Sequence, residues 1–168
     1  DRTYMQNIAE WLGQNSSSAG KSILVYGTCG PDRHAFVEKM LPALEQRGFK
    51  VRITDRKETP EVNERVLGEY SQVWIFFGGP GQATYLSDVE LAAISRFVDD
   101  GKSMLVVAGK PQHGYDDLNA ANRLSSRYGI TYAGFAEHEG ELLVSPVSRF
   151  LYKASGTLGN LLKLVHKA

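Results

Sequence analysis

The sequence predicts a doubly wound α/β domain, and three observations support that prediction. Short continuous apolar runs at residues 22–26, 73–77 and 104–107 are typical of parallel strands that are buried on both faces. Segments with apolar residues at helical spacing separate these runs. Loops rich in glycine and proline follow the runs directly. Strands that alternate with helices favour right-handed crossovers, so we expect one mostly parallel sheet with helices on both faces, in three α/β/α layers.

The first half of the chain is predicted to hold three helices and two strands. Apolar spacing predicts a helix over 3–12, and a linker rich in glycine and serine follows it. The next helix, over 35–47, is expected to kink at Pro42 and to end at Gly48. The strand at 49–54 alternates apolar and polar residues, which indicates a place near a sheet edge. A short helix over 59–69 has Pro60 in its first turn.

The second half continues the alternation. Ser87 and Glu90 form a capping box that predicts where a helix begins, and Gly101 marks where it ends. Helical spacing returns over 116–128 and stops at Gly129, after which we expect a short strand at 130–132. The remaining predicted elements are an extended segment at 141–144 and helices at 150–152 and 158–166.

Composition excludes several classes of protein. The 168 residues suit one domain, and Lys plus Arg equals Asp plus Glu at 19 each, so the basic excess of a nucleic-acid-binding protein is missing. No apolar run approaches the roughly 18 residues of a membrane helix, so we expect no membrane insertion by this segment. The single cysteine, Cys29, excludes an internal disulfide and a Cys-rich zinc site but leaves the cellular compartment open.

Two parts of the chain are distinguished by composition. Residues 1–20 form the predicted N-terminal helix and its Ser-rich linker, and residues 21–168 form the α/β domain. The sequence starts at Asp1 without a methionine, so we expect a piece of a longer protein. The first helix is then either the tail of a preceding domain or a helix that packs back onto this one.

Ligands of doubly wound sheets bind outside the carboxyl ends of the strands. Three predicted loops lie there and are candidates for ligand binding: 27–34, 78–85 and 109–115. In the first loop the Cys29 thiol, near a helix start and beside Arg33 and His34, has the surroundings of a nucleophile. The simpler interpretation is a small loop residue. A phosphatase loop has five residues between its cysteine and arginine, whereas three separate Cys29 from Arg33. The candidate ligand-binding residues of the three loops are Gly27, Thr28, Arg33, Gly78, Gly79, Lys110 and Gln112.

A flavin phosphate site is a second alternative for the first loop. The opening Tyr26-Gly27-Thr28 resembles a flavodoxin phosphate loop, which would make the chain an electron carrier that binds flavin mononucleotide (FMN). Pro31 removes a backbone donor from such a site, and Asp32 adds negative charge where the phosphate would lie. These two residues argue against the site, and we expect no cofactor.

The other loops offer little chemistry. Glycines in the second loop let backbone amides approach an oxyanion, but they more often simply form the turn. In the third loop His113 is a candidate general base, although a plain surface histidine is the simpler interpretation. His138 lies among Glu137, Glu139 and Glu141 at a spacing that fits no recognised ligand pattern, so we expect a solvated acidic loop and no metal site.

Three segments together resemble a known family. They are ILVYGTCGPDRH, YSQVWIFFGGPGQATYLSDVELAAISRFVDDGKSMLVVAG and DLNAANRLSSRYGITY. In their order of strand, Gly-Pro loop, capped helix and apolar strand they resemble the class I glutamine amidotransferase-like superfamily, in its trehalose-utilisation (ThuA-like) and related non-amidotransferase branches. The match spans residues 21–147 and implies a flavodoxin-like sheet.

The resemblance also has consequences for function. Catalytic members have a nucleophilic cysteine on a sharp elbow after the strand that here is 104–107, and a downstream His-x-Glu pair assists it. This chain has Val107-Ala108-Gly109 at that place and no such pair, so we expect no glutaminase activity. The favoured interpretation is a non-catalytic structural or interaction module that binds other domains, a protein or a sugar. The alternative is a small-molecule hydrolase or isomerase that uses Cys29 with His34 or His113.

Overall fold

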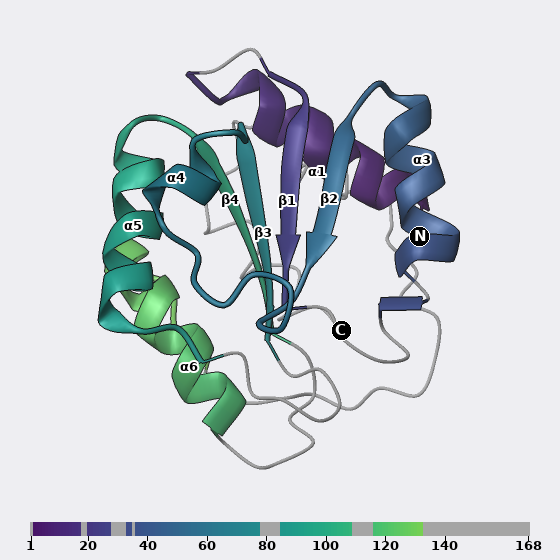
Figure 1. Cartoon of the computed structure of the whole chain (residues 1–168). Coiled ribbons are helices and arrows are strands. Elements are labelled where there is room, and N and C mark those ends of the chain that lie inside the picture. Colours follow the sequence, from purple (N-terminus) through teal and green to yellow (C-terminus); the bar gives the residue numbers. More distant parts are fainter. Residues whose placement is uncertain are drawn as a thin grey trace, which may run out of the picture. The chain divides into compact units, whose positions relative to one another are not determined.

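A four-stranded parallel sheet forms the centre of the fold, which confirms the predicted flavodoxin-like α/β class. The computed structural model describes residues 2–17, 20–27, 33–34, 36–77, 85–108 and 116–132. The strand order is β2-β1-β3-β4, and every neighbouring pair is parallel (Figure 1). The strands are β1 (Ser22–Tyr26), β2 (Lys50–Thr54), β3 (Gln72–Phe77) and β4 (Ser103–Ala108).

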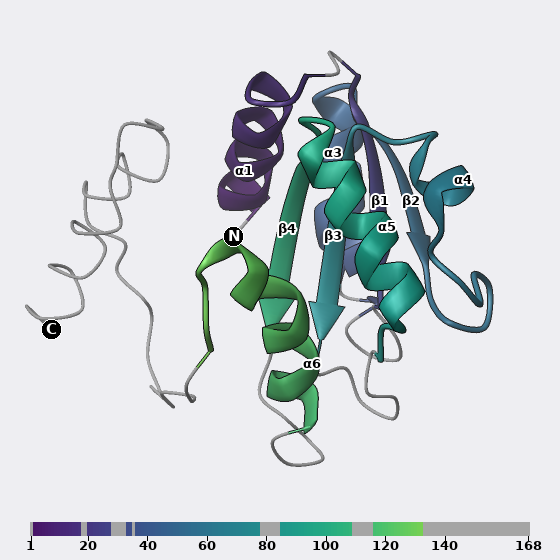
Figure 2. The same cartoon turned by 90° about the vertical axis from the view of Figure 1, so that its left-hand side faces the viewer.

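Helices cover both faces of this sheet, as predicted for a three-layer fold. One face packs against α1 (Arg2–Gln14), the π-helical turn η1 (Phe36–Met40) and α3 (Leu41–Gln46). The other packs against α4 (Glu64–Leu67), α5 (Asp88–Asp99) and α6 (Asp116–Ser125), which continues into the 3₁₀ turn η2 (Ser126–Tyr128). Figure 2 shows α5 and α6 together in front of the sheet.

The central strands are buried on both faces because their side chains alternate between two cores. Ile23 and Val25 of β1 pack with α1 and α3, whereas Leu24 and Tyr26 face the core that contains α5. β3 alternates in the same way. β2 is the outer strand of the described sheet, and its first four residues are only half-buried or exposed. The polar alternation that predicted an edge position for this strand is therefore confirmed.

The N-terminal helix α1 is fastened to the sheet by side chains that reach its backbone. Gln72 Nε2 donates to the Ala9 carbonyl over 2.8 Å, and Ser103 Oγ donates to the Leu12 carbonyl over 2.8 Å. After the helix, the Ser17 backbone N–H donates to the Gly101 carbonyl over 2.7 Å. These contacts show α1 packed onto this domain, as one of the two expectations had it. The boundary at residue 20 stays a prediction.

Two of the predicted helices have different limits in the structure. The predicted segment 35–47 is helical over 36–46, but it consists of two helix types: the π-helical η1 runs directly into α3, where Pro42 lies in the first turn and its missing N–H costs nothing. The kink expected at Pro42 stays a prediction. The expected helix over 59–69 is reduced to α4. Asn63 caps α4 by accepting a hydrogen bond from the Val66 N–H, so the helix begins four residues after Pro60.

The strand expected at 130–132 is not a strand. The Asn122 side chain accepts from the Tyr132 N–H over 2.7 Å and donates to the Tyr132 carbonyl over 2.9 Å. The Asn122 amide therefore occupies the backbone groups that a neighbouring strand would use. The segments expected at 141–144, 150–152 and 158–166 lie outside the described residues.

Candidate functional site

The carboxyl edge of the sheet contains a topological switch point between β1 and β3. After β1 the chain passes to η1 and α3 on one face, whereas after β3 it passes to α5 on the other face. Doubly wound sheets bind ligands in the crevice that this divergence opens. The described residues at this edge lie at the end of β1, in the turn after β2 and at the start of α5.

An ion pair between a half-exposed arginine and a buried glutamate joins two of these segments. Arg56, in the turn after β2, donates from Nη1 to Glu90 Oε1 over 2.6 Å and from Nη2 to Glu90 Oε2 over 3.0 Å. The Glu90 side chain is only 1% exposed, whereas that of Arg56 is 37% exposed. Parallel double hydrogen bonds of this kind fix the orientation of both side chains as well as their distance. We refer to this pair as the Arg56–Glu90 clamp.

Both members of the clamp also bind backbone groups. Glu90 accepts from the Val62 N–H over 2.9 Å and from the Ser87 N–H over 2.8 Å, and the second bond completes the predicted capping box of α5. Arg56 donates to the carbonyls of Pro60 and Tyr85, and its guanidinium lies 5.7 Å from the centre of the Tyr26 ring. The clamp therefore connects the end of β1, the turn after β2 and the segment that leads from β3 into α5.

Both side chains of the clamp are stabilised in their ionised forms. Burial opposes ionisation of Glu90, but the hydrogen bonds from Arg56, Val62 and Ser87 outweigh it and lower the Glu90 pKa. Burial likewise acts to lower the pKa of Arg56, while the Glu90 carboxylate more than compensates and raises it. The guanidinium and the carboxylate thus stabilise each other's charged forms.

Tyr26, at the end of β1, is buried beside the clamp. Burial raises the pKa of Tyr26 to about 12, although the nearby Arg56 charge opposes that rise. Its hydroxyl lies 3.5 Å from the Thr59 carbonyl, and the Thr54 and Thr59 hydroxyls share a buried hydrogen bond of 2.7 Å. This phenol is therefore held neutral and is unsuited to act as a base near neutral pH.

The candidate ligand-binding residues Gly27 and Arg33 lie at this edge. Gly27 has a φ of 92°, which favours glycine, and its N–H donates to the Thr54 carbonyl. Arg33 is held by carboxylates of the turn after β2: it lies 2.9 Å from Glu58 and 3.5 Å from Asp55. Asp55 is itself fixed in that turn by the N–H groups of the two residues after Arg56. The Arg33 guanidinium thus links the loop after β1 to the turn after β2.

The candidate His34 occupies a different environment. Its Nε2 lies 3.1 Å from Glu38 one helical turn later, and its side chain is 74% exposed. A histidine at such an exposed place lacks the desolvated surroundings that usually prepare a general base. The other predicted site residues lie outside the described part of the chain: Thr28, Cys29, Gly78, Gly79, Lys110, Gln112 and His113.

Sequence reasoning missed Arg56 and the second role of Glu90. Glu90 was predicted as the capping partner of Ser87, and its longer-range pairing has no local signal. Among the residues that the structure describes, no group of three or more His, Cys, Asp or Glu side chains is arranged to hold a metal ion. Likewise, none of the described helices has the length and apolar character needed to cross a membrane.

Comparisons of the chain with models of protein families, with curated proteins and with solved structures found no match. The fold class therefore follows from the strand order and the helix layers described above, and a fold of this class does not by itself specify a function.

Proposed function

We propose that this chain is a non-catalytic binding module that holds a ligand or a partner at the carboxyl edge of its sheet. The observation that supports this most directly is the switch point between β1 and β3, with Gly27 at the end of β1. A left-handed glycine at a strand end allows close backbone approach of a ligand. The resemblance in the sequence to non-amidotransferase branches points to the same use.

The Arg56–Glu90 clamp supports a role in binding because it holds the backbone segments at this edge in place. It holds the Tyr85 carbonyl, the start of α5 and the turn after β2 in one arrangement. Loops that begin and end on fixed anchors lose less conformational entropy when a ligand binds. We therefore treat Arg56 and Glu90 as positioning residues and expect neither to contact the ligand.

The chemistry of the described candidates argues against catalysis. Arg33 is paired with Asp55 and Glu58, and His34 is an exposed partner of Glu38. The sequence Val107-Ala108-Gly109 also lacks a nucleophile at the elbow where amidotransferases have a cysteine.

Activity assays test the non-catalytic part of the proposal. Purified chain is assayed for ammonia release from L-glutamine and for hydrolysis of p-nitrophenyl acetate, beside the variant Cys29→Ala. We expect both proteins to match the rate of the buffer blank. Turnover by the parent chain that Cys29→Ala abolishes would instead establish the hydrolase alternative.

Binding is tested by amide chemical shifts on isotope-labelled protein with two probes, trehalose as the sugar and FMN as the flavin. We expect trehalose to shift resonances at Gly27, Arg33 and the turn after β2, and Arg33→Ala to weaken this response. The matched control is Arg47→Ala, which removes an exposed ion pair with Glu10 remote from this edge. A response to FMN at the same residues favours the electron-carrier alternative, and the absence of any shift with trehalose argues against a sugar ligand.

A further inference from the structure

A second surface, separate from the carboxyl edge, lies along the outer strand β2. In a parallel sheet, the backbone N–H and C=O groups of one residue point to the strand on one side, and those of the next residue point to the other side. The Lys50 N–H donates to the Lys21 carbonyl, and the Thr54 carbonyl accepts from Gly27, so the even-numbered residues of β2 are bonded to β1. The backbone groups of Val51 and Ile53 therefore point away from β1, and within the described residues β2 has no other neighbouring strand.

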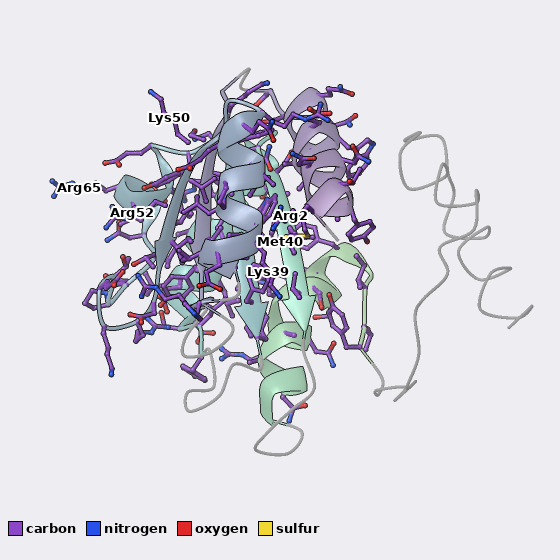
Figure 3. The ribbon with its side chains drawn as sticks, turned by 90° about the vertical axis from the view of Figure 1, so that its right-hand side faces the viewer. Arg2, Lys39, Met40, Lys50, Arg52 and Arg65 are labelled. Carbon is purple, nitrogen blue, oxygen red and sulfur yellow. The ribbon has the colours of Figure 1, made fainter. Side chains whose placement is uncertain are left out.

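The side chains of β2 divide this edge into a charged face and an apolar face. Lys50 and Arg52 are exposed on one face of the strand, and their side chains make no hydrogen bond or ion pair with any described residue. Val51 and Ile53 lie on the other face, half-buried against the core of α1 and α3. Figure 3 shows Lys50 and Arg52 projecting to the same side of the molecule, and Arg65 of α4, also without a described partner, projects to that side too.

We propose that the β2 edge binds an extended segment of a partner protein in which acidic and apolar residues alternate. The partner strand would pair with the outward N–H and C=O groups of Val51 and Ile53. Its acidic side chains would lie beside Lys50 and Arg52, and its apolar side chains would extend the layer formed by Val51 and Ile53. Opposite charges on neighbouring strands attract, so these two cations, which have no partner in the described part of the chain, select the partner strand by charge as well as by shape.

The same cations have a purely structural interpretation, which the experiment must separate from binding. Charged residues, lysine above all, commonly protect an edge strand from unwanted pairing. A protective role predicts that the edge rejects every added strand. A binding role predicts acceptance of an acidic strand and rejection of a basic one, so peptides of opposite charge distinguish the two.

The test measures fluorescence anisotropy of a labelled peptide with the core Glu-Val-Glu-Val-Glu against the full chain. Two control peptides replace every Glu by Lys, or the central residue by Pro, which cannot donate to the ladder. We expect binding of the acidic peptide that weakens with added salt, and no binding of either control. No binding of the acidic peptide, or equal binding of the Pro peptide, overturns the proposal.

Charge-reversal variants test whether the peptide binds at Lys50 and Arg52. Lys50→Glu/Arg52→Glu replaces two attractive pairs by two repulsive ones, and we expect about a tenfold loss of affinity or more. The matched control is Arg2→Glu/Lys39→Glu, which changes the net charge equally at exposed cations that Figure 3 shows away from Lys50 and Arg52. Equal losses in both double variants would show a general charge effect and contradict the proposal.

Hydrogen exchange gives a readout that charge alone does not affect. On addition of the acidic peptide, the amides of Val51 and Ile53 should gain protection, because they point outward in the free chain. The amides of Lys50 and Arg52 already face β1 and should change little. Protection that appears elsewhere, with Val51 and Ile53 unchanged, would also overturn the proposal.

Discussion

Arg56 and Glu90 are 34 residues apart in the chain, yet they form a double hydrogen bond of 2.6 Å and 3.0 Å across the carboxyl edge of the sheet. Glu90 is buried and also caps α5, so one carboxylate both begins a helix and anchors the turn after β2. A buried carboxylate bonded in this way specifies one arrangement of its surroundings, because most alternatives leave its charge without a partner. The clamp therefore fixes the positions of the turn after β2 and the start of α5, which border the candidate site.

Breaking the clamp from the arginine side should be costly. Arg56→Met leaves the Glu90 charge buried without its cation, so we expect the free energy of unfolding to fall by about 3 kcal/mol. Glu90→Leu should cost at least as much, because it leaves the buried Val62 N–H and the Ser87 N–H without their acceptor, even though the half-exposed Arg56 charge can reach water. The double variant is expected to lose less than the sum of the two single variants. Urea unfolding of the four proteins gives the coupling energy.

A second ion pair on the same helix provides the control for this cycle. Arg96 of α5 pairs with Glu64 of α4, but these side chains are 67% and 60% exposed. The corresponding cycle, Arg96→Met with Glu64→Leu, should give a coupling energy below about 1 kcal/mol. A coupling energy at Arg56–Glu90 as small as in this control would show that the clamp does not stabilise the edge.

The fold class and the positions of several elements could be predicted because their signals are local. Apolar runs mark β1 and β3, and the Ser87–Glu90 spacing marks the start of α5 within four residues of sequence. Arg56 has no such signal. It lies in a polar turn, and its partner is specified only once β2 and α5 meet in space. The sequence therefore predicts a candidate site at the carboxyl edge of the sheet, but it does not predict that Arg56 and Glu90 hold that edge together.

The errors at the other elements have a similar origin. The strand expected at 130–132 follows a correct pattern of residue types, but the Asn122 side chain competes for the Tyr132 backbone. The helix expected over 59–69 failed because the Val62 N–H bonds Glu90 and the Pro60 carbonyl bonds Arg56. In both places a side chain from outside the segment uses the backbone groups that a regular element would need.

Acid should destabilise the protein partly through Glu90. Its folded-state pKa lies below the ordinary value of 4.5, so its contribution to stability is present above that pH and is lost as pH falls through the folded-state pKa. In Arg56→Met the main group that lowers this pKa is gone, so the loss of stability on acidification should be smaller than in the parent chain. Urea unfolding at a series of acidic pH values measures both slopes. Identical slopes would mean that Glu90 does not depend on Arg56 for its charge.

Base should destabilise the protein through Tyr26. Burial raises its pKa to about 12 from 10.0, so between these values only the unfolded chain ionises this phenol. Stability should therefore decrease as pH rises through that window, by on the order of 3 kcal/mol in total. Burial also raises the pKa of Tyr132, so the comparison is with Tyr26→Phe, which removes one of the two dependences. Tyrosinate absorbance follows the ionisation, and urea unfolding gives the free energy of unfolding at each pH. If this free energy falls with pH as steeply in Tyr26→Phe as in the parent chain, the prediction for Tyr26 is wrong.

Ser17, in the segment after α1, is packed against Gly101. Gly101, before β4, has a φ of +82°, and a Cβ placed there would lie 2.8 Å from Ser17 Oγ and 2.9 Å from Ser17 Cβ. Ser17 makes hydrogen bonds to the backbone carbonyls of Asp100 and Gly101, each 2.7 Å long. Gly101→Ala should therefore both strain the backbone and displace Ser17 from these bonds.

Gly129 provides a matched control for the backbone strain alone. Its φ is +74°, and a Cβ there would meet nothing within 4 Å. We expect Gly129→Ala to lower the free energy of unfolding by about 1–2 kcal/mol and Gly101→Ala by roughly 1 kcal/mol more. Ser17→Gly removes the side chain that the new Cβ would meet, so the added loss should nearly vanish when Gly101→Ala is measured in that background. If the loss persists there, Ser17 is not what the new methyl group displaces, and the segment after α1 is fixed by other contacts.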